Sequence, residues 1–569
     1  MLRSQFSATR TEVVAENGVV TGGHAAEAEA GLRMLQQGGN AIDAVVSAAF
    51  AGCVVEPDSC GLGGYGRLAI FHAERGEFVT IDQCARAPGA ARPDMFVPDE
   101  STAPRYYGHP RTIGRRNEWG HLAVAVPGAV AGLCAAHDLF GALPLAQVLE
   151  PAIELADAGL VVTWDLAVSI LEHYRELQQV PHAAALLLPG GRPPQAYSAW
   201  APGDRLDFSA LGQTLRRIAR QGAAGFYTGP VAEAIEREVV SHGGLLTAND
   251  LEAYRPKILR ERPGVYRGRP YITAFDQVGY EALNILDQYD LAALGPDSVA
   301  FRHLVAEAFG HAFADSLTHY GDPDHTHSPV NGLASRAFAV ARAAGLRLDR
   351  AAPRPIQAGD PWPFENQHSA PESISTRPSL AGLEGTTQMA AADRAGNMVT
   401  LCTSITGSLG SLVVVPGTGI ILNNAMQNFD PRPDQPNCIR PGKMPIFGVP
   451  TLVMTENGRA RFGSCGSSGY RILTGVLHSL MHHLDFGMPL QAAVDAPRVH
   501  CQGQDTYVDD RLPAEVQAGL TALGHTVIPQ PEEPNLTHFG RVNAVAVDPR
   551  TRLLHAGTGP AWSTAAVGY

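Results

Sequence analysis

The chain has 569 residues, of which 45% are hydrophobic and 17% are charged. At ~150 residues per domain, this length allows three or four domains or one large layered unit. Lys and Arg number 43 against 56 Asp and Glu, which gives a net charge of −13 at pH 7. The chain therefore lacks the positive field that a nucleic-acid backbone attracts, and we expect no nucleic-acid partner.

The N-terminal part predicts two helices and a hairpin. The first ten residues contain no apolar core, so they do not read as a targeting signal. Residues 25–37 favour a helix that ends at Gly38-Gly39, and residues 41–55 favour a second that ends before Pro57. The second segment includes Asp43 and is shorter than the ~20 residues that cross a bilayer. We expect a cytoplasmic protein without a membrane partner, and alternating apolar residues predict a hairpin over 67–81.

The middle of the chain is helical by its apolar periodicity, and the second half begins with strands. The clearest helical stretches are 145–160, 211–221, 231–242 and 299–320. Residues 351–384 are rich in proline and carry no apolar period, which predicts an exposed linker. Strands are predicted over 386–392, 398–404, 411–415, 420–422 and 451–455. Strands between two helical regions indicate a layered α/β architecture.

Several motifs fail on inspection. Gly61–Gly66 has the spacing GxGxxG, but a helix precedes it and a strand follows, the reverse of a dinucleotide site, so it predicts a tight glycine loop. Gly463–Gly469 contains no serine with glycine at both −2 and +2, so it is no nucleophile elbow. The histidines at 325, 327, 478, 482 and 483 lack cysteine or carboxylate partners at metal spacing, and the eight cysteines form no CxxC pair. We expect reduced thiols, no metal and no cofactor.

One hairpin brings two hydroxyl groups together. The turn Asp393–Asn397 joins the strands at 386–392 and 398–404, and a hairpin centred on Ala395 places Thr386 opposite Ser404. Facing side chains lie ~5 Å apart at Cβ, so the two hydroxyls are within reach of each other. A slip of one residue in register would separate them. On spacing alone, a β-favouring Thr-Thr pair on an ordinary hairpin is the better explanation of this pattern.

At this point the chain resembles the gamma-glutamyltransferase family of N-terminal nucleophile hydrolases. The resemblance extends over nearly the whole length, through residues 31–43 (GLRMLQQGGNAID), 56–66 (EPDSCGLGGYG), 126–133, 225–227, 243–251, 321–323, 385–397 (GTTQMAAADRAGN), 416–424 (PGTGIILNN), 495–498 (DAPR) and 524–525. It implies a four-layer αββα sandwich, one structural domain in which a large fragment (1–385) and a small fragment (386–569) are intertwined. It also implies that the chain cuts itself between Gly385 and Thr386, and that the linker at 351–384 then leaves the active-site mouth.

The resemblance assigns a role to each catalytic candidate. Thr386 is the nucleophile, and the α-amine freed by cleavage has a reference pKa near 8 and acts as the base for the Thr386 hydroxyl. Ser404 supports the nucleophile, and Thr406 is a polar position on the substrate side. The backbone donors for the oxyanion come from Gly466 and Ser467, in a loop at 463–471 where the family usually has two glycines.

The amino-acid subsite departs from the family pattern. The arginine that grips the substrate's α-carboxylate is absent from Asp82-Gln83-Cys84-Ala85, and Arg86 lies two positions further on, ~6.6 Å along a strand. The acidic residue that binds the α-amino group is Asn428, the neighbouring glutamine is Ala425, and the usual serine pair is Ile446–Gly448 after Lys443. We therefore place Cys84, Arg86, Thr406, Asn428 and Lys443 at a substrate pocket that is more apolar and less charged.

Four functions stay open. The first is an autoprocessed amidohydrolase or acyltransferase with a small-molecule amide or acyl donor other than an ordinary γ-glutamyl compound. The second is a hydrolase of carbon–carbon bonds in a secondary-metabolite pathway, recognisable by the carbon fragment that it releases. The third is a true glutathione hydrolase or gamma-glutamyltransferase. The fourth is an uncleaved, non-catalytic relative, which would remain a single chain.

Overall fold

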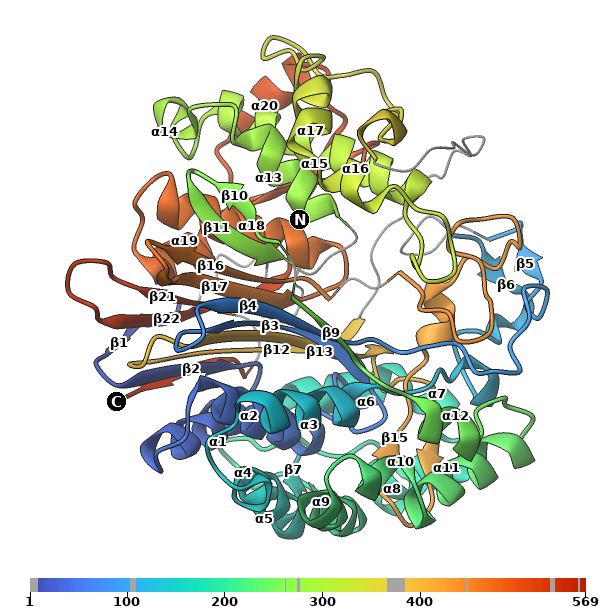
Figure 1. Ribbon diagram of the computed structural model, residues 1–569. Coiled ribbons are helices and arrows are strands. Elements are labelled where there is room, and N and C mark those ends of the chain that lie inside the picture. The colour runs from blue at the N-terminus through green and yellow to red at the C-terminus, as the bar shows by residue number, and fades with distance from the viewer. Residues whose placement is uncertain are drawn as a thin grey trace.

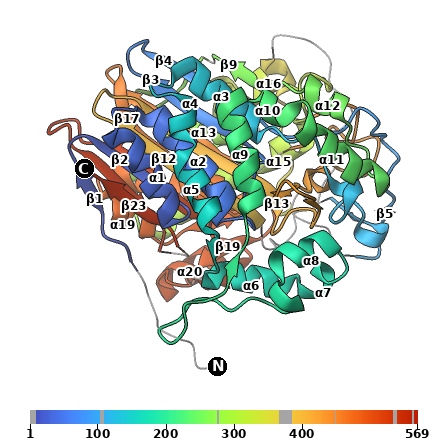
Figure 2. The ribbon, with the colours of Figure 1, turned by 90° about the horizontal axis from the view of Figure 1, so that it is seen from below.

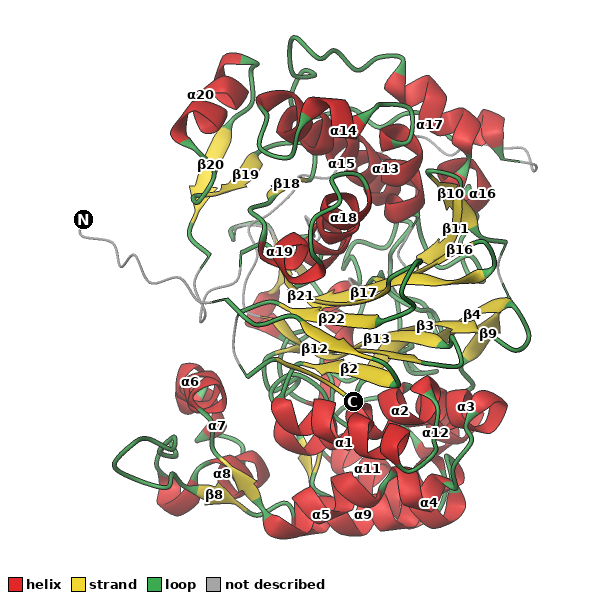
Figure 3. Cartoon of the chain, turned by 90° about the vertical axis from the view of Figure 1, so that its left-hand side faces the viewer, coloured by secondary structure: helices red, strands yellow, loops and turns green. Residues whose placement is uncertain are grey.

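In the computed structural model, residues 9–102, 109–260, 262–273, 277–365, 384–446, 449–532, 538–560 and 563–569 are described. Two sheets of seven strands lie face to face, with one layer of helices above them and another below (Figures 1 and 3). This layering confirms the αββα sandwich predicted from the sequence. Within the described ranges, no helix combines the length and the apolar character needed to cross a membrane.

The lower sheet contains the predicted hairpin at its centre. Its strands run in the order β23 (Ala565–Gly568), β2 (Gly18–Gly22), β12 (Glu384–Asp393), β13 (Met398–Gly407), β3 (Tyr65–His72), β4 (Glu77–Gln83) and β9 (Lys257–Leu259). Every neighbouring pair is antiparallel. Strands from both sides of Gly385 therefore alternate within a single sheet.

The upper sheet mixes distant segments in the same way. Its order is β1 (Val13–Ala15), β22 (Leu554–Thr558), β21 (Arg541–Val547), β17 (Arg459–Ser467), β16 (Thr451–Glu456), β11 (Arg269–Thr273) and β10 (Gly264–Tyr266). Small and branched apolar side chains fill the space between the sheets, among them Val19, Ala390, Met398, Val453 and Val545. Both sheets contain strands from before and after Gly385, as the predicted intertwining requires.

The lower helical layer begins with the two helices predicted near the N-terminus. They are α1 (Ala25–Gln36) and α2 (Ala41–Val55), and α3 (Ala129–Phe140), α5 (Glu150–Ala158), α9 (Ser209–Gln221) and α11 (Pro230–Ser241) complete the layer (Figure 2). Asn40 caps α2 in a reciprocal capping box with Asp43, which satisfies the first amide groups of the helix. Every residue of α2 is buried, because it lies between the sheet and the outer helices.

The predicted helix over 145–160 is two helices in the structure. α4 (Leu145–Val148) ends before α5, which has Pro151 in its first turn, and Leu160 belongs to a short strand, β7 (Leu160–Val161). Proline favours the first turn of a new helix over the interior of a continuing one. The remaining helices of this side include α6 (Trp164–Glu172), α7 (Tyr174–Leu177), α8 (Pro181–Leu187), α10 (Ala224–Tyr227) and α12 (Ala248–Ala253).

The upper helical layer is built around α15 (Val299–His319), in agreement with the predicted helix at 299–320. It also contains α13 (Val278–Leu286), α17 (Arg336–Ala343), α18 (Arg471–Leu484), α19 (Leu490–Asp495) and α20 (Ala514–Ala522). Beside it lies a small sheet of β18 (Val499–Cys501), β19 (Thr506–Asp509) and β20 (Val527–Gln530). All eight cysteines are buried free thiols, as the sequence predicted.

The first part of the predicted linker differs from an exposed segment. Residues 351–365 pack against the upper layer: the amide of Ala352 donates to Glu307 Oε2 (3.2 Å), that of Ile356 to the carbonyl of Gly503 (2.8 Å), and Trp362 is buried. The exposed linker was expected because the many prolines leave no regular spacing of apolar residues. Single apolar residues, Ile356 and Trp362, are nevertheless buried and anchor the segment. The rest of the predicted linker, up to residue 383, lies outside the described residues.

Candidate active site

The hairpin of β12 and β13 has the predicted register. Thr386 faces Ser404, and Gly385 faces Thr406, so the register shifts between Gly385 and Thr386 and the extra residue of the bulge is Ile405 of β13. A bulge inserts an extra residue and turns the local side chains and carbonyl groups out of the regular ladder. The irregularity therefore falls on the peptide bond for which cleavage is predicted.

A chain of hydrogen bonds passes through this bulge. The Thr386 hydroxyl donates to Ser404 Oγ (3.0 Å), the Ser404 hydroxyl donates to the carbonyl oxygen of Gly385 (2.6 Å), and the Thr406 amide donates to Ser404 Oγ (2.8 Å). Thr386 and Ser404 are 3% and 1% exposed. Ser404 thus contacts both the Thr386 hydroxyl and the Gly385 carbonyl oxygen, the two groups of the predicted cleavage, in a place from which bulk water is excluded.

The backbone at Thr406 is unusual. Its φ is 80°, in the region that favours glycine, and its hydroxyl is hydrogen-bonded to the Tyr65 hydroxyl at 2.9 Å. Such a conformation persists only when the surroundings hold it. Here it accompanies the Thr406 amide's contact with Ser404, so Thr406 supports the hydroxyl pair through its main chain.

Gly385 has no room for a side chain. A Cβ atom at this position would lie 2.3 Å from the carbonyl oxygen of Asp58 and 2.7 Å from that of Gly407. Both are backbone atoms, which cannot rotate away as a flexible side chain can. The backbone at Gly385 therefore has a course that only glycine can follow.

The glycine loop over 61–66 borders the same hairpin. A Cβ atom would lie 2.6 Å from the Ser404 carbonyl oxygen at Gly64 and 2.3 Å from the Cys402 carbonyl oxygen at Gly66. The glycine loop predicted from the sequence is present over residues 61–64, whereas Tyr65 and Gly66 already belong to β3. The small residues bring this backbone close to β13.

The segment predicted as an oxyanion loop is mostly strand. β17 continues to Ser467, where Gly466 pairs with Val542 and Ser467 with Arg541, and only Ser468–Tyr470 connect it to α18. Cys465 explains the longer strand, since its thiol faces the other sheet and donates to the Met389 carbonyl (3.2 Å). Gly466 and Ser467 are buried at the end of a strand, with Ser468 at φ 100° directly after them.

Arg541 is the residue at this site that the sequence did not indicate. From β21 its Nη2 atom donates to the carbonyl oxygen of Thr386 (3.1 Å), and its Nε atom donates to Ser467 Oγ (2.7 Å). The guanidinium group thus joins Thr386 to the strand that contains the predicted oxyanion residues Gly466 and Ser467. No motif surrounds Arg541 in the sequence, so only the three-dimensional pairing reveals it.

Cys84 and Arg86 lie beyond the end of β4. The Cys84 thiol donates to the Gly66 carbonyl (3.5 Å), and burial raises its pKa well above the usual range. Arg86 is mostly buried, with Nη1 3.8 Å from Asp322 Oδ2. Asp322 therefore already faces Arg86, the cation that lies two positions beyond the missing family arginine.

Asn428 and Lys443 lie on the segment that passes over the same region. Asn428 ends the short helix η5 (Ala425–Asn428), and its Nδ2 atom is buried without a partner among the described residues. The Lys443 ammonium donates to the Pro436 carbonyl (2.5 Å), and burial lowers its pKa. The Lys443 carbonyl accepts from the Ala87 amide (2.8 Å), which ties this segment to Arg86. Phe447 and Gly448 lie outside the described residues.

A cavity of about 60 Å³ adjoins Gly385 and Arg541 on the side of the lower helices, and four acidic residues line it: Glu56, Asp58, Asp165 and Glu172. Burial raises the pKa of Asp58, and it raises the pKa of Asp165 to about 6. A second cavity of about 600 Å³ shares His24, Val55, Thr163 and Ser563 with the first. The two cavities thus share part of their lining, and the first of them lies beside Gly385.

Two groups elsewhere could each offer three ligands to a metal ion, with ligand atoms within 4.8 Å of one another. In the first, His121, Glu238 and His242, the two imidazole rings are stacked at 4.5 Å. The second, His303, Glu307 and His525, already contains the Arg354 guanidinium, bonded to Glu307 and to His525. Neither group contains any of the five histidines that the sequence analysis considered as metal ligands.

Comparison with known proteins agrees with this geometry. The family model described as Gamma-glutamyltranspeptidase matches residues 27–569. The chain belongs to this family. Its members here include "Acylase ACY 1 proenzyme" of Pseudomonas sp. (strain V22), 35% identical over 565 residues that cover 97% of this chain and 94% of that protein. "Glutathione hydrolase proenzyme" of Bacillus subtilis (strain 168) is 30% identical over 541 residues, 94% of this chain and 88% of that protein.

Among solved structures, cephalosporin acylase from Bacillus halodurans is similar, with a TM-score of 0.84 and 27% identity over 100% of this chain and 98% of that one. The gamma-glutamyltranspeptidase fold thus extends over the whole chain. The protein is an enzyme of the N-terminal nucleophile hydrolase and acyltransferase class.

Proposed function

We propose that the chain is an autoprocessing amidohydrolase or acyltransferase in which Thr386 is the nucleophile. The observation that carries the proposal is the Ser404 hydroxyl, which is hydrogen-bonded to both Thr386 Oγ1 and the Gly385 carbonyl. One group thus touches the oxygen that attacks and the oxygen that accepts charge. The relatives named proenzymes support maturation by cleavage.

Self-cleavage proceeds in two steps, an acyl shift from nitrogen to oxygen and the hydrolysis of the resulting ester. In the first, Thr386 Oγ1 attacks the Gly385 carbonyl carbon, the C–N bond breaks, and the hydroxyl proton moves to the leaving α-amine, which leaves an ester. In the second, water attacks this ester and restores the Thr386 hydroxyl and a free Gly385 carboxyl group. The resulting fragments, 1–385 and 386–569, remain together as a heterodimer.

The mature enzyme repeats this chemistry on an external substrate. The free α-amine of Thr386 takes the hydroxyl proton, Thr386 Oγ1 attacks the amide carbonyl, and the proton passes to the leaving amine. Water or a second amine then accepts the acyl group. Ser404 keeps its place beside the carbonyl oxygen, and the backbone near Gly466 and Ser467 supplies the remaining donors.

The substrate is an acyl donor other than an ordinary γ-glutamyl compound. Asp322 faces Arg86, and Lys443 is buried against the Pro436 carbonyl, so neither cation is held ready for an α-carboxylate. Asn428 offers a neutral amide where a carboxylate would bind an ammonium group, and a neutral acceptor binds it more weakly. This pocket supports an acyl chain without the amino-acid head group.

Denaturing mass analysis of the purified protein tests the nucleophile. We expect wild-type protein to give fragments 1–385 and 386–569, Thr386→Ser to give the same pair more slowly, and Thr386→Ala to stay intact. Thr387→Ala is the matched control, because it removes the same groups one residue away on the opposite face of the strand, and it should be cleaved. An intact wild-type chain would contradict the proposal.

Three chromogenic anilides test the acyl group: γ-glutamyl, glutaryl and valeryl 4-nitroanilide. The first carries both charged groups of the head, the second lacks the amine, and the third lacks both. We expect the γ-glutamyl compound to have the lowest kcat/KM. A γ-glutamyl preference of tenfold or more would instead identify a true gamma-glutamyltransferase.

A further inference from the structure

The guanidinium group of Arg541 has two contacts that no resemblance accounts for. It bonds the carbonyl oxygen of the nucleophile's own residue and the hydroxyl of Ser467. Arg541 is 8% exposed, so its charge acts with little screening by water. Because it contacts Thr386 itself, it lies within one residue's length of the α-amine that cleavage would release.

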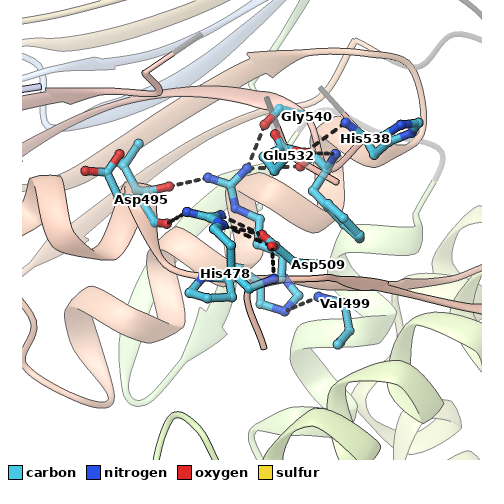
Figure 4. Close-up of polar contacts among 12 residues, drawn as sticks. His478, Asp495, Val499, Asp509, Glu532, His538 and Gly540 are labelled. Carbon is cyan, nitrogen blue, oxygen red and sulfur yellow. Dashed lines mark hydrogen bonds and ion pairs between the residues drawn. The ribbon is translucent and has the colours of Figure 1, made fainter. Parts of the chain in front are cut away.

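The turn before Arg541 is clamped in place. Arg498, of the sequence Asp495-Ala496-Pro497-Arg498, donates to the carbonyls of Phe539 (3.0 Å) and Gly540 (2.6 Å). Glu532 accepts from the amides of His538 (2.9 Å) and Phe539 (3.2 Å), as Figure 4 shows. Gly540 has φ 79° and would place a Cβ atom 2.9 Å from the Arg471 carbonyl oxygen. Two side chains thus fix, through four hydrogen bonds, the backbone that places Arg541 beside Thr386.

We propose that Arg541 is a positioning residue, which holds Thr386 against the end of β17 and keeps the α-amine of mature Thr386 in its neutral, proton-accepting form. This role rests on the proposed function, since the α-amine exists only after cleavage. A nearby cation disfavours the ammonium form of an amine, and a neutral amine is required to take the hydroxyl proton.

The acidic residues of the cavity act in the opposite direction. Glu56, Asp58 and Asp165 line the cavity together with Arg541, and Glu172 lies further along its wall. An ionised carboxylate favours the ammonium form, so without Arg541 this cavity would raise the pKa of the amine. His24 also lines the cavity, and burial lowers its pKa, which leaves it neutral near pH 7. Burial has the opposite effect on Glu27, which is paired with Glu56: it raises the pKa of the Glu27 carboxyl group.

The test follows the pH dependence of the nucleophile without any knowledge of the substrate. Phenylmethanesulfonyl fluoride reacts with a base-activated hydroxyl, and the mass of fragment 386–569 reports the reaction. The rate is measured from pH 5 to 9 on the cleaved fraction of wild-type protein and of Arg541→Gln, Arg541→Lys and Asp165→Asn. Arg394→Gln, at the exposed tip of the same hairpin, is the control for a lost positive charge.

We expect Arg541→Gln to move the acid limb of the rate profile up by ~1 pH unit and to slow sulfonylation at pH 7 about fivefold or more. Arg541→Lys should keep the limb near its wild-type position, and Asp165→Asn should move it down. Arg394→Gln should leave it unchanged. Opposite shifts of the acid limb for Arg541→Gln and Asp165→Asn would show that the two side chains act through their charges. A purely structural role would not produce opposite shifts.

Two results would overturn the proposal: identical limbs for wild type and Arg541→Gln, or equal shifts for Arg541→Gln and Arg541→Lys. If Arg541→Gln is not cleaved, the comparison of Arg541→Lys with Asp165→Asn decides the question. The proposal requires the acid limb of Asp165→Asn to lie at lower pH than that of Arg541→Lys, and equal limbs would overturn it. A wild-type chain that is never cleaved disproves the proposed function itself, whereas a cleaved wild type with an unmoved limb in the variants disproves only the role of Arg541.

Discussion

At the scale of single residues, the peptide between Gly385 and Thr386 combines steric crowding with a hydrogen bond to its carbonyl group. The Gly385 carbonyl accepts from Ser404 while two backbone carbonyls crowd its Cα atom. Hydrogen bonding to the carbonyl favours attack on it, and the crowding fixes its direction. The site therefore depends on a residue without a side chain as much as on the two hydroxyl groups.

Gly385→Ala should strongly impair self-cleavage. The added methyl would lie 2.3 Å from the Asp58 carbonyl oxygen, so the bulge has to move and the Gly385 carbonyl leaves its place beside Ser404. We expect cleavage to slow by at least 100-fold, measured as fragment formation over time after purification. Gly345→Ala is the control, since its nearest contact would be the Arg342 carbonyl oxygen at an ordinary 3.6 Å. Cleavage of Gly385→Ala at the wild-type rate would contradict this account of the bulge.

The sequence predicted the part of the site that a single hairpin defines. The turn at 393–397 is enough to place Thr386 opposite Ser404, and the structure has this register. Arg541 could not be predicted in this way, because it lies 155 residues from Thr386 and reaches it across two packed sheets. The roles assigned to Asn428, Arg86 and Lys443 from the resemblance stay predictions.

At the scale of elements, the turn that precedes β21 has a pH-sensitive anchor. Burial raises the pKa of Glu532 to about 7 from its ordinary 4.5, while its carboxylate accepts two backbone amides. Asp495, Asp509 and His478 lie in the same group of polar contacts (Figure 4). The anchor of the Arg541 turn is therefore a carboxyl group that ionises near neutral pH.

This carboxyl group predicts a loss of stability as the pH rises. Between pH 4.5 and about 7 the unfolded chain gives up the Glu532 proton while the folded chain retains it, so the free energy of unfolding falls, by up to about 3 kcal/mol. Glu532→Gln should lack this fall, because the amide never ionises. Chemical denaturation of both proteins from pH 4.5 to 8 measures the difference, and exposed Glu515→Gln is the control. Parallel curves for wild type and Glu532→Gln would refute the expectation.

Elements were predicted well where a local signal marks their ends. Asn40 and Pro57 delimit α2, and the structure begins and ends this helix at the predicted residues. β17 was mistaken for a loop over its last residues, because glycines and serines resemble a turn. Its pairing with β21 and its packing against Met389 are long-range contacts, which local propensity does not contain.

At the scale of the whole molecule, both sheets contain strands from each side of Gly385. In the lower sheet β12 lies between β2 and β13, and in the upper sheet β16 pairs with β11. The layered class followed from helical regions on either side of the strands, but the strand order did not, because it depends on pairings between distant segments. The packed course of 351–365 escaped prediction for the same reason.

Fragments 1–385 and 386–569 should stay associated after cleavage. Separating them would break strand pairs in both sheets and expose the apolar layer between them. We expect one peak at the mass of the intact protein in native size exclusion, and two species only after denaturation. Dissociation of the cleaved protein in native buffer would contradict the intertwined arrangement.

The crowding at Gly385 has a further consequence for the mature enzyme. On the proposed mechanism, the peptide cut during maturation is the first acyl group that Thr386 accepts, at a place that the carbonyl groups of Asp58 and Gly407 border. A substrate whose carbonyl takes the position of the Gly385 carbonyl must bring a methylene group as its neighbouring carbon. We therefore expect the proposed self-cleavage site to select its substrates by shape: acyl chains that are straight beside the carbonyl should react, and chains branched there should not.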